Sequence, residues 1–333
     1  MAIPIKEEAK GIFRLGALET GRPSANTSPF LVVGEERAAI VEPGEEGQAP
    51  QLLEGIKQLG VGLDRVAYVI ASHIHLHHIQ GVPTLLKGLP QAKFVVHPRG
   101  APHVIEPTRL IESTLAIFGP DCYRPMTPVP ADRVMPVNDG QVLGLGGREL
   151  EIIWSPGHAP HHMCIFDRLT RVVFAGDAFG TGEGSFGRPG RPGDSPTMYN
   201  PDMAVASLHR LRDLKPSIFL VFGQRQPLPA EDTLKGGEAN IRAIERICLE
   251  GMRQKVGIDE LDRRCDQFAD WVRTERVEGY DTGFGALRRR DQGAPPALVQ
   301  YLRRQDPSLE MPAGAEQKTI TSGHRWRTEH PKS

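Results

Sequence analysis

The feature that most constrains this chain is a cluster of histidines directly after a segment typical of a buried strand. Val66–Ala71 is a continuous run of β-branched, aromatic and small apolar residues, as expected for a strand covered on both faces. Residues 72–78 follow at once and read SHIHLHH. Because ligands collect at the carboxyl ends of strands in α/β sheets, the sequence predicts a polar site at this strand end.

The four imidazoles of this cluster predict metal binding. His73 and His75 are two residues apart, so in an extended backbone they point the same way. His78 begins a predicted helix over residues 79–86, which turns it towards a neighbouring position. Imidazole is the commonest metal ligand near neutral pH. A surface patch or an expression tag explains the cluster less well, because it is internal and interleaved with apolar residues.

Alternating elements predict an α/β fold over the first two-thirds of the chain. Short β-branched or aromatic runs predict strands, and helical spacing of apolar residues predicts helices between them. The predicted strands are Gly11–Leu15, Phe30–Val33, Ala38–Glu42, Val66–Ala71, Lys93–His97, Glu149–Trp154, Met163–Asp167, Arg171–Ala175 and Ser217–Phe222, and the predicted helices are Pro50–Leu59, Thr108–Phe118 and Met203–Leu214. Residues 1–232 are predicted to form one domain with a helical insertion at about 98–134 and a long functional loop at 179–200.

The last third of the chain has a helical pattern. Four apolar residues share one helical face and four share another, namely Ile241, Ile244, Cys248 and Met252, then Leu261, Cys265, Phe268 and Val272. Residues 233–304 are therefore predicted to be a helical extension. Residues 305–333 hold almost no apolar side chains and are predicted to be a flexible tail.

Two further strand ends carry metal-ligating side chains. The predicted strand Glu149–Trp154 is followed by Ser-Pro-Gly and His158, and the strand that ends at Ala175 is followed by Gly176 and Asp177. Each motif alone is weak, because Gly-His is common and Gly-Asp is usually a turn. In this order after the histidine cluster, they predict that one imidazole and one carboxylate converge with it.

At these residues the sequence resembles the metallo-β-lactamase superfamily. The resemblance covers roughly residues 10–226 and rests on the family order H-x-H-x-D-H, Pro-Gly-His, Gly-Asp and a late histidine. Asn26-Thr27 and Glu42-Pro43-Gly44 also look like that family's early strand and acidic turn. The lactonase and glyoxalase II-like hydrolases look nearest. The resemblance implies an α/β fold, a four-layer αββα sandwich with metal at the strand ends, followed here by the helical C-terminal extension.

The chain departs from the family pattern at two positions. His77 stands where the family has aspartate, and Gln224 stands where it has the late histidine. The first metal site implied by the resemblance keeps His73, His75 and His158, and three imidazoles plus water form the open arrangement of a catalytic zinc. The second site keeps His78 and the bridging candidate Asp177. His77 could add a nitrogen ligand to it, and Gln224 an amide oxygen.

These departures leave three outcomes open. The chain could hold one metal ion, or two ions in a second site rebuilt around His77, or it could bind metal without catalysing hydrolysis. Zinc, as one or two ions, is the expected cofactor, and iron or manganese are the alternatives. Metal content per chain separates the first two outcomes.

By resemblance, the expected activity is hydrolysis of a lactone, ester or thioester bond in a small molecule. An activated water would attack the carbonyl carbon. His77 is the candidate for proton transfer, since an unperturbed imidazole has a pKa of about 6.5. Asp177 would bridge two metals, or orient the water if only one is present. Both are therefore candidate catalytic residues.

Two other classes of function remain as alternatives. One is a diiron redox protein, which is disfavoured because such relatives usually carry glutamate where this chain has His75, and because no flavodoxin-like half follows. The other is a catalytically degenerate, metal-stabilised scaffold. Chelator-sensitive hydrolysis of generic esters and lactones would distinguish the enzyme from the scaffold.

Composition and charge narrow the expected partners and location. The chain of 333 residues has 40 basic and 41 acidic side chains, so no net charge attracts nucleic acid. No apolar run is long enough for a membrane span or an export signal, and the four cysteines form no C-x-x-C pair. We expect a cytoplasmic protein with a small-molecule substrate and neither membrane nor nucleic-acid partners. The insertion at 98–134 could form a homodimer contact.

Overall fold

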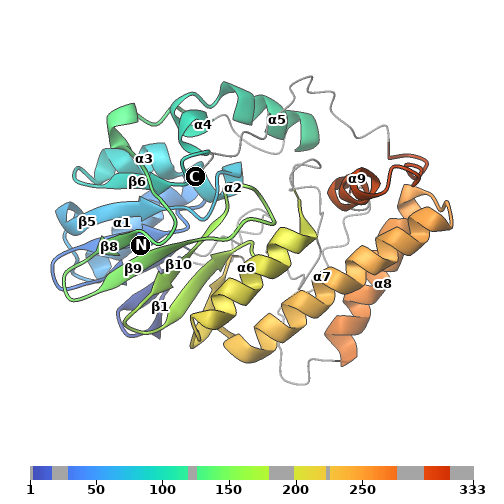
Figure 1. The fold of residues 1–333 in the computed structure, drawn as a ribbon. Coiled ribbons are helices and arrows are strands. Elements are labelled where there is room, and N and C mark those ends of the chain that lie inside the picture. Colours follow the sequence, from blue (N-terminus) through green and yellow to red (C-terminus); the bar gives the residue numbers. More distant parts are fainter. Residues whose placement is uncertain are drawn as a thin grey trace, which may run out of the picture.

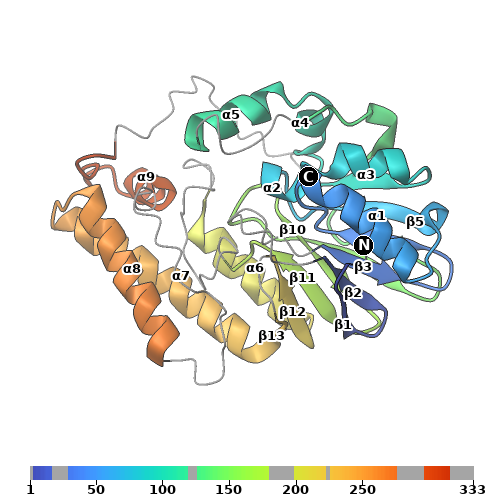
Figure 2. The same cartoon turned by 180° about the vertical axis from the view of Figure 1, so that it is seen from behind.

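The computed structural model describes residues 3–16, 29–118, 126–179, 199–222, 226–275 and 296–315. In this part of the chain two β-sheets pack face to face and helices cover the outer face of each (Figures 1 and 2). This is the four-layer αββα sandwich that the sequence predicts.

The first sheet runs in chain order from β1 to β7. Its strands are β1 (Ile5–Ala9), β2 (Ile12–Leu15), β3 (Phe30–Val33), β4 (Ala38–Val41), β5 (Val66–Ile70), β6 (Lys93–Val96) and β7 (Val134–Pro136). The pairs from β1 to β4 are antiparallel, and those from β4 to β7 are parallel. The carboxyl ends of β4, β5 and β6 therefore lie side by side at one edge.

The second sheet has the order β13-β12-β11-β10-β9-β8. Its strands are β8 (Val142–Gly144), β9 (Glu149–Trp154), β10 (Met163–Asp167), β11 (Val172–Gly176), β12 (Ile218–Val221) and β13 (Leu228–Pro229). β11 and β12 are parallel, and the other pairs are antiparallel. β9 and β11 point the same way on either side of β10, so their carboxyl ends share an edge.

Three apolar layers hold the sandwich together. Between the sheets, buried side chains such as Phe30 and Phe174 meet edge to face with their ring centroids 5.3 Å apart. Outside the first sheet pack α1 (Ala49–Gln58) and α3 (Val82–Gly88). Outside the second sheet pack α6 (Pro201–Asp213) and α7 (Ala230–Arg253).

The helical extension packs around α7, which begins at Ala230. The apolar faces of α7 and α8 (Ile258–Glu275) and the buried side of α9 (Pro296–Gln305) form a separate core. Leu309 and Ala315 are buried in the same core. This section of the predicted flexible tail is therefore packed on the helices, because its few apolar side chains find a place there; residues 316–333 lie outside the described residues.

The observed elements match most predicted strands to within a residue, differ from the prediction in two places, and add one short helix to the insertion. The short strands β1, β7, β8 and β13 were not expected, because they are brief or polar and form only as edges of existing sheets. The helix expected over 79–86 is two helices, α2 (Leu76–Ile79) and α3, so His77 lies within a helix. The insertion contains α4 (Ala101–Ile105) and α5 (Thr108–Phe118).

Two predicted features lie partly or wholly outside the described residues. Of the loop at 179–200, residues 180–198 are not described, and neither are Asn26 and Thr27. Among the helices that are described, none is both long and apolar enough to cross a membrane.

Candidate metal centre

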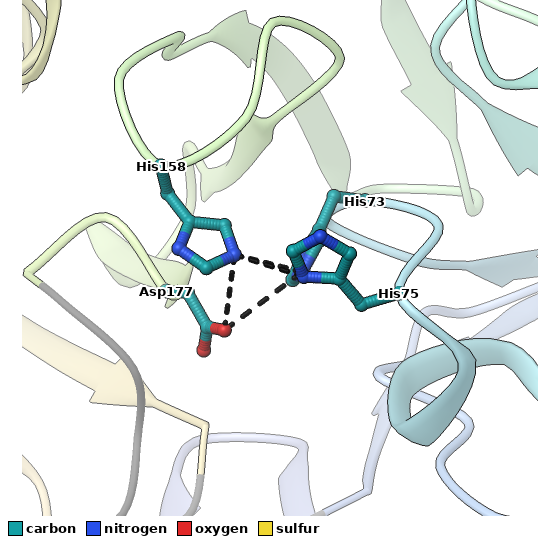
Figure 3. A group of neighbouring side chains, drawn as sticks. All are labelled: His73, His75, His158 and Asp177. Carbon is teal, nitrogen blue, oxygen red and sulfur yellow. Dashed lines mark hydrogen bonds and ion pairs between the residues drawn. The ribbon is translucent and has the colours of Figure 1, made fainter. Parts of the chain in front are cut away.

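Four side chains from both sheets meet at one edge of the sandwich (Figure 3). His73 and His75 follow β5 in the first sheet, whereas His158 follows β9 and Asp177 follows β11 in the second. The parallel direction of these strands in each sheet brings their carboxyl ends to this edge. The structure therefore brings the three sequence motifs together, as predicted.

The three imidazoles approach one another closely. Nε2 of His73 lies 2.8 Å from Nδ1 of His75 and 3.2 Å from Nε2 of His158. Nδ1 of His75 and Nε2 of His158 are 3.0 Å apart. Three ring nitrogens aimed at one point, with a carboxylate oxygen beside them, form the donor set of a tetrahedral zinc site.

Asp177 joins this set to a second one. Its Oδ2 is 3.4 Å from Nε2 of His158 and 3.4 Å from Nε2 of His78. His77, His78 and Asp177 offer ligand atoms within 4.8 Å of one another, as do His73, His75, His158 and Asp177. The carboxylate thus stands between two donor groups, and His77 lies with the second.

The environment of Asp177 fits a cation. Both carboxylate oxygens are buried, and neither accepts a hydrogen bond within the described part of the chain. Burial raises the pKa of Asp177, but His78 and His158 outweigh it and hold the pKa below the usual range. A buried ionised carboxylate is costly unless a positive charge compensates it, and the protonated ring of His78, or a metal ion in its place, supplies that charge.

The imidazoles of His73, His75 and His77 are in the form that binds metal. Burial, followed by the neighbouring imidazoles, lowers the pKa of His73 and of His75 well below the ordinary value. Burial, with His78 adding to it, lowers the pKa of His77 to about 3. Each of these three rings is therefore neutral at pH 7 and has a lone pair available for coordination, whereas His78 must lose its proton before it can bind an ion.

Glu42 contacts the ring nitrogen of His78 that faces away from Asp177. It is buried at the end of β4, and its Oε2 lies 2.6 Å from Nδ1 of His78, while its Oε1 accepts a hydrogen bond from the Ser72 backbone N–H. Burial lowers the pKa of His78, but Glu42 and Asp177 raise it to about 9. Glu42 also has a φ of 59°, a strained conformation for this residue type. In the sequence, Glu42 stands out only as part of the acidic turn Glu42-Pro43-Gly44.

His162 holds the backbone of Asp177. Its Nε2 accepts the Asp177 backbone N–H at 3.1 Å, so the ring proton is on Nδ1, which donates to Ser155 Oγ at 2.9 Å. The Ser155 hydroxyl in turn donates to Cys164 Sγ at 3.1 Å. Ser72 plays a similar part for His73, with its Oγ 3.0 Å from Nδ1, so that Nε2 faces the centre. Such outer partners orient metal ligands.

The position between Ser72 and His162 requires a glycine, Gly176. Its φ is +49°, and a Cβ there would overlap Ser72 Oγ and lie 2.8 Å from His162 Nε2. Only glycine adopts this backbone freely and leaves room for both side chains.

Of the predicted site residues, all but one are in this centre. His73, His75, His77, His78, His158 and Asp177 are brought together, whereas Gln224 lies outside the described residues. A role for His162 in hydrogen bonding beside the ligands is consistent with its place just after His158, but the partners of Glu42 and His162 leave no local pattern, because these hydrogen bonds connect distant strand ends. The close Pro-Gly-His-x-x-x-His spacing was the available signal for His162.

The model of the metallo-β-lactamase superfamily matches residues 24–223, which is more than half of the chain. The protein therefore belongs to the metallo-β-lactamase superfamily. Its fold, its His/Asp centre and its strand-end motifs agree with this membership.

Two relatives and one solved structure are similar to this chain. The metallo-β-lactamase fold-containing protein ST1585 of Sulfurisphaera tokodaii is 29% identical over 52% of this chain and 67% of its own. A hydroxyacylglutathione hydrolase of Francisella tularensis subsp. novicida is 26% identical over 61% of this chain and 62% of its own. The chain thus spans about two-thirds of these relatives. The crystal structure of TTHA1429 from Thermus thermophilus superposes with a TM-score of 0.61 at 20% identity, covering 89% of this chain and 94% of that one, and shows the shared fold.

Proposed function

We propose that this protein is a zinc-dependent hydrolase that cleaves a lactone, ester or thioester bond in a small molecule. The observation that carries the proposal is the convergence of His73, His75 and His158 on one point beside the buried carboxylate of Asp177. The similarity to a hydroxyacylglutathione hydrolase supports the same class of reaction.

The donor residues divide into two sets around Asp177. His73, His75 and His158 would hold the first ion, and we infer that His77 and His78 hold a second, with Asp177 shared between them. A divalent ion bound there supplies Lewis-acid chemistry, acidifying water and polarising a carbonyl group. Exchanging the family's aspartate for His77 removes one negative charge, so the second ion should be the more weakly held.

The chain's own residues supply orientation and proton transfer. The ionised Asp177 carboxylate accepts hydrogen bonds and so orients a water molecule between the two sets of donors. His77 is neutral and half-buried beside His78, with ring centroids 4.3 Å apart. It would coordinate the second ion or, where only the first ion is bound, accept a proton from the nucleophile, although a pKa of about 3 makes it a weaker base than an ordinary imidazole. The Phe222 ring stacks on His78 with centroids 3.8 Å apart and keeps water from that side.

Metal content and turnover test the proposal together. The protein, purified without added metal, is analysed for metal by mass spectrometry and then assayed on a generic ester, thioester and lactone with and without chelator. We expect zinc and chelator-sensitive turnover. His158→Ala should lose the first ion and the activity, while His209→Ala, at an exposed histidine paired with Glu238, should retain both.

His77 is tested by substitution with the family's own residue. His77→Ala should leave about one zinc ion per chain. His77→Asp should recreate the family's second site and bind the second ion at least about tenfold more tightly than the wild-type protein does. Iron in place of zinc with no hydrolysis would favour the diiron redox alternative. Metal-dependent folding with no turnover on any ester, thioester or lactone would favour the scaffold.

A further inference from the structure

Two buried ring nitrogens beside the metal centre have no hydrogen-bond partner among the described residues. They are Nε1 of Trp154 and Nδ1 of His161. His161 is 7% exposed. Buried polar atoms are nearly always paired with protein, water or ligand, so these two atoms point to a partner that the described residues do not supply.

Both residues adjoin the metal ligands. The His161 ring centroid lies 6.2 Å from those of His73 and His75, and it is stacked on the first and edge-on to the second. Trp154 ends β9 and its ring lies 4.4 Å from that of His97, which follows β6. The two nitrogens therefore belong to the same edge of the sandwich as the centre.

The cluster formed by Trp154, His97 and His161 presents hydrogen-bond donors. Indole Nε1 is only a donor. Nδ1 of His97 accepts the Arg99 backbone N–H at 3.0 Å, so the proton of that ring is on Nε2, which is a second donor. After burial, His97 is the neighbour that most strongly lowers the pKa of His161, which places the two imidazoles close together.

The charge around this cluster favours an anion. The acidic residue that raises the pKa of His97 is Asp139. Its carboxylate already accepts hydrogen bonds from the Trp154 backbone N–H at 2.7 Å and from the Arg210 guanidinium at 2.9 Å. Arg99 lowers the pKa of His97, and Arg109 lowers the pKa of His103, which in turn lowers the pKa of His161, so two fixed positive charges act on this group of side chains. Several N–H donors near fixed positive charge suit a carboxylate, which accepts several hydrogen bonds at once.

We propose that Trp154, His97 and His161 form a subsite that binds a carboxylate group of the substrate. The assignment of this group to the substrate rests on the hydrolase function proposed above. It deepens that function by defining the substrate as an anionic ester, lactone or thioester, whose carboxylate is held beside the reacting carbonyl.

The indole N–H of Trp154 gives a direct readout that needs no turnover. The chain has three tryptophans, so the zinc-loaded, ¹⁵N-labelled protein should show three indole signals, and Trp154→Phe identifies one of them. Acetate is the probe and neutral acetamide is its control. Acetate should shift the Trp154 signal saturably, whereas acetamide should not, and the Trp271 and Trp326 signals should stay in place.

Two variants test the part of His161. His161→Leu removes the ring nitrogen and should weaken acetate binding about tenfold, while His161→Asn keeps a polar group near the Nδ1 position and should retain most of it. His209→Ala is the matched control. An unshifted Trp154 signal would overturn the subsite, and an equal response to acetamide would overturn its assignment to an anion.

A final comparison separates this subsite from the metal ions. If chelator abolishes the acetate response while the control signals still report a folded chain, acetate was bound by the metal and the proposal fails. If the response persists, the subsite stands even when no hydrolysis is found in the ester, thioester and lactone assay. The failure of either proposal can therefore be told from the failure of the other.

Discussion

Glu42 Oε2 lies 2.6 Å from Nδ1 of His78, and both side chains are buried. The contact joins the ends of two neighbouring strands of the first sheet, because Glu42 follows β4 and the histidine cluster follows β5. It fixes Nε2 of His78 towards Asp177, 3.4 Å away. The second set of donors is thus oriented by a carboxylate that is not itself among them.

Glu42→Gln tests this arrangement. The amide keeps the size of the side chain but loses its charge, so the second ion should bind about 10–100-fold more weakly, while the ion on His73, His75 and His158 stays. Metal per chain after dialysis measures the effect. Glu238→Gln is the matched control, since Glu238 makes a similar contact with His209 on the exposed surface. Equal loss of both ions would contradict the assignment.

His162 should support the position of Asp177 through one hydrogen bond. His162→Leu removes the acceptor of the Asp177 backbone N–H and should weaken zinc binding by about tenfold or more. His162→Gln offers an acceptor at a similar distance and should recover most of that affinity. Competition with a zinc-chelating dye gives the values, and circular dichroism checks the fold. Identical affinities of the two variants would count against a positioning role.

Gly176→Ala should destabilise the protein through the backbone and through overlap. A positive φ costs about 1–2 kcal/mol for alanine, and the contacts with Ser72 and His162 bring the expected loss in free energy of unfolding to about 2–4 kcal/mol. Gly140→Ala is the control, because Gly140 has a φ of +73° with no atom within 4 Å of its Cβ position. Denaturant unfolding compares them, and equal losses would mean that backbone strain alone decides.

A buried ion pair far from the centre should matter for stability alone. Arg148 and Asp167 are buried and share two hydrogen bonds of 2.9 Å. Asp167→Asn should lower the free energy of unfolding by about 3–5 kcal/mol, since it leaves a buried cation unpaired. Glu149→Gln, in the exposed pair with Arg168, should have no measurable effect. A small loss for Asp167→Asn would show that water reaches Arg148.

The residues themselves predict an α/β fold and the principal donors, and the family resemblance implies the four-layer sandwich. Val66–Ala71 and the strands that end before His158 and Asp177 are apolar enough to be recognised one at a time. Strand direction places His73 and His75 at one edge of the first sheet and His158 and Asp177 at one edge of the second, and the packing of the two sheets then brings these edges together. The first set of donors could therefore be predicted from three local motifs.

The supports of the centre could not be predicted in this way. Glu42 contacts a residue 36 positions away, and His162 contacts the backbone of Asp177, 15 positions away. These contacts depend on the register between strands, which no local pattern records. The splitting of the expected helix into α2 and α3 had the same origin: Gly81 fits beneath the Gly44–Glu45 backbone, where a Cβ would lie 2.8 Å from the carbonyl oxygen of Glu45.

The donors of the first set come from both sheets, His73 and His75 from one and His158 and Asp177 from the other. Opening the sandwich at this edge must therefore separate donors that bind together. Any ion held by all four would oppose that opening by mass action. Amide hydrogens of β5 and β11 should then exchange with solvent more slowly as zinc concentration rises, so that the metal acts as a reversible crosslink between the two halves of the domain.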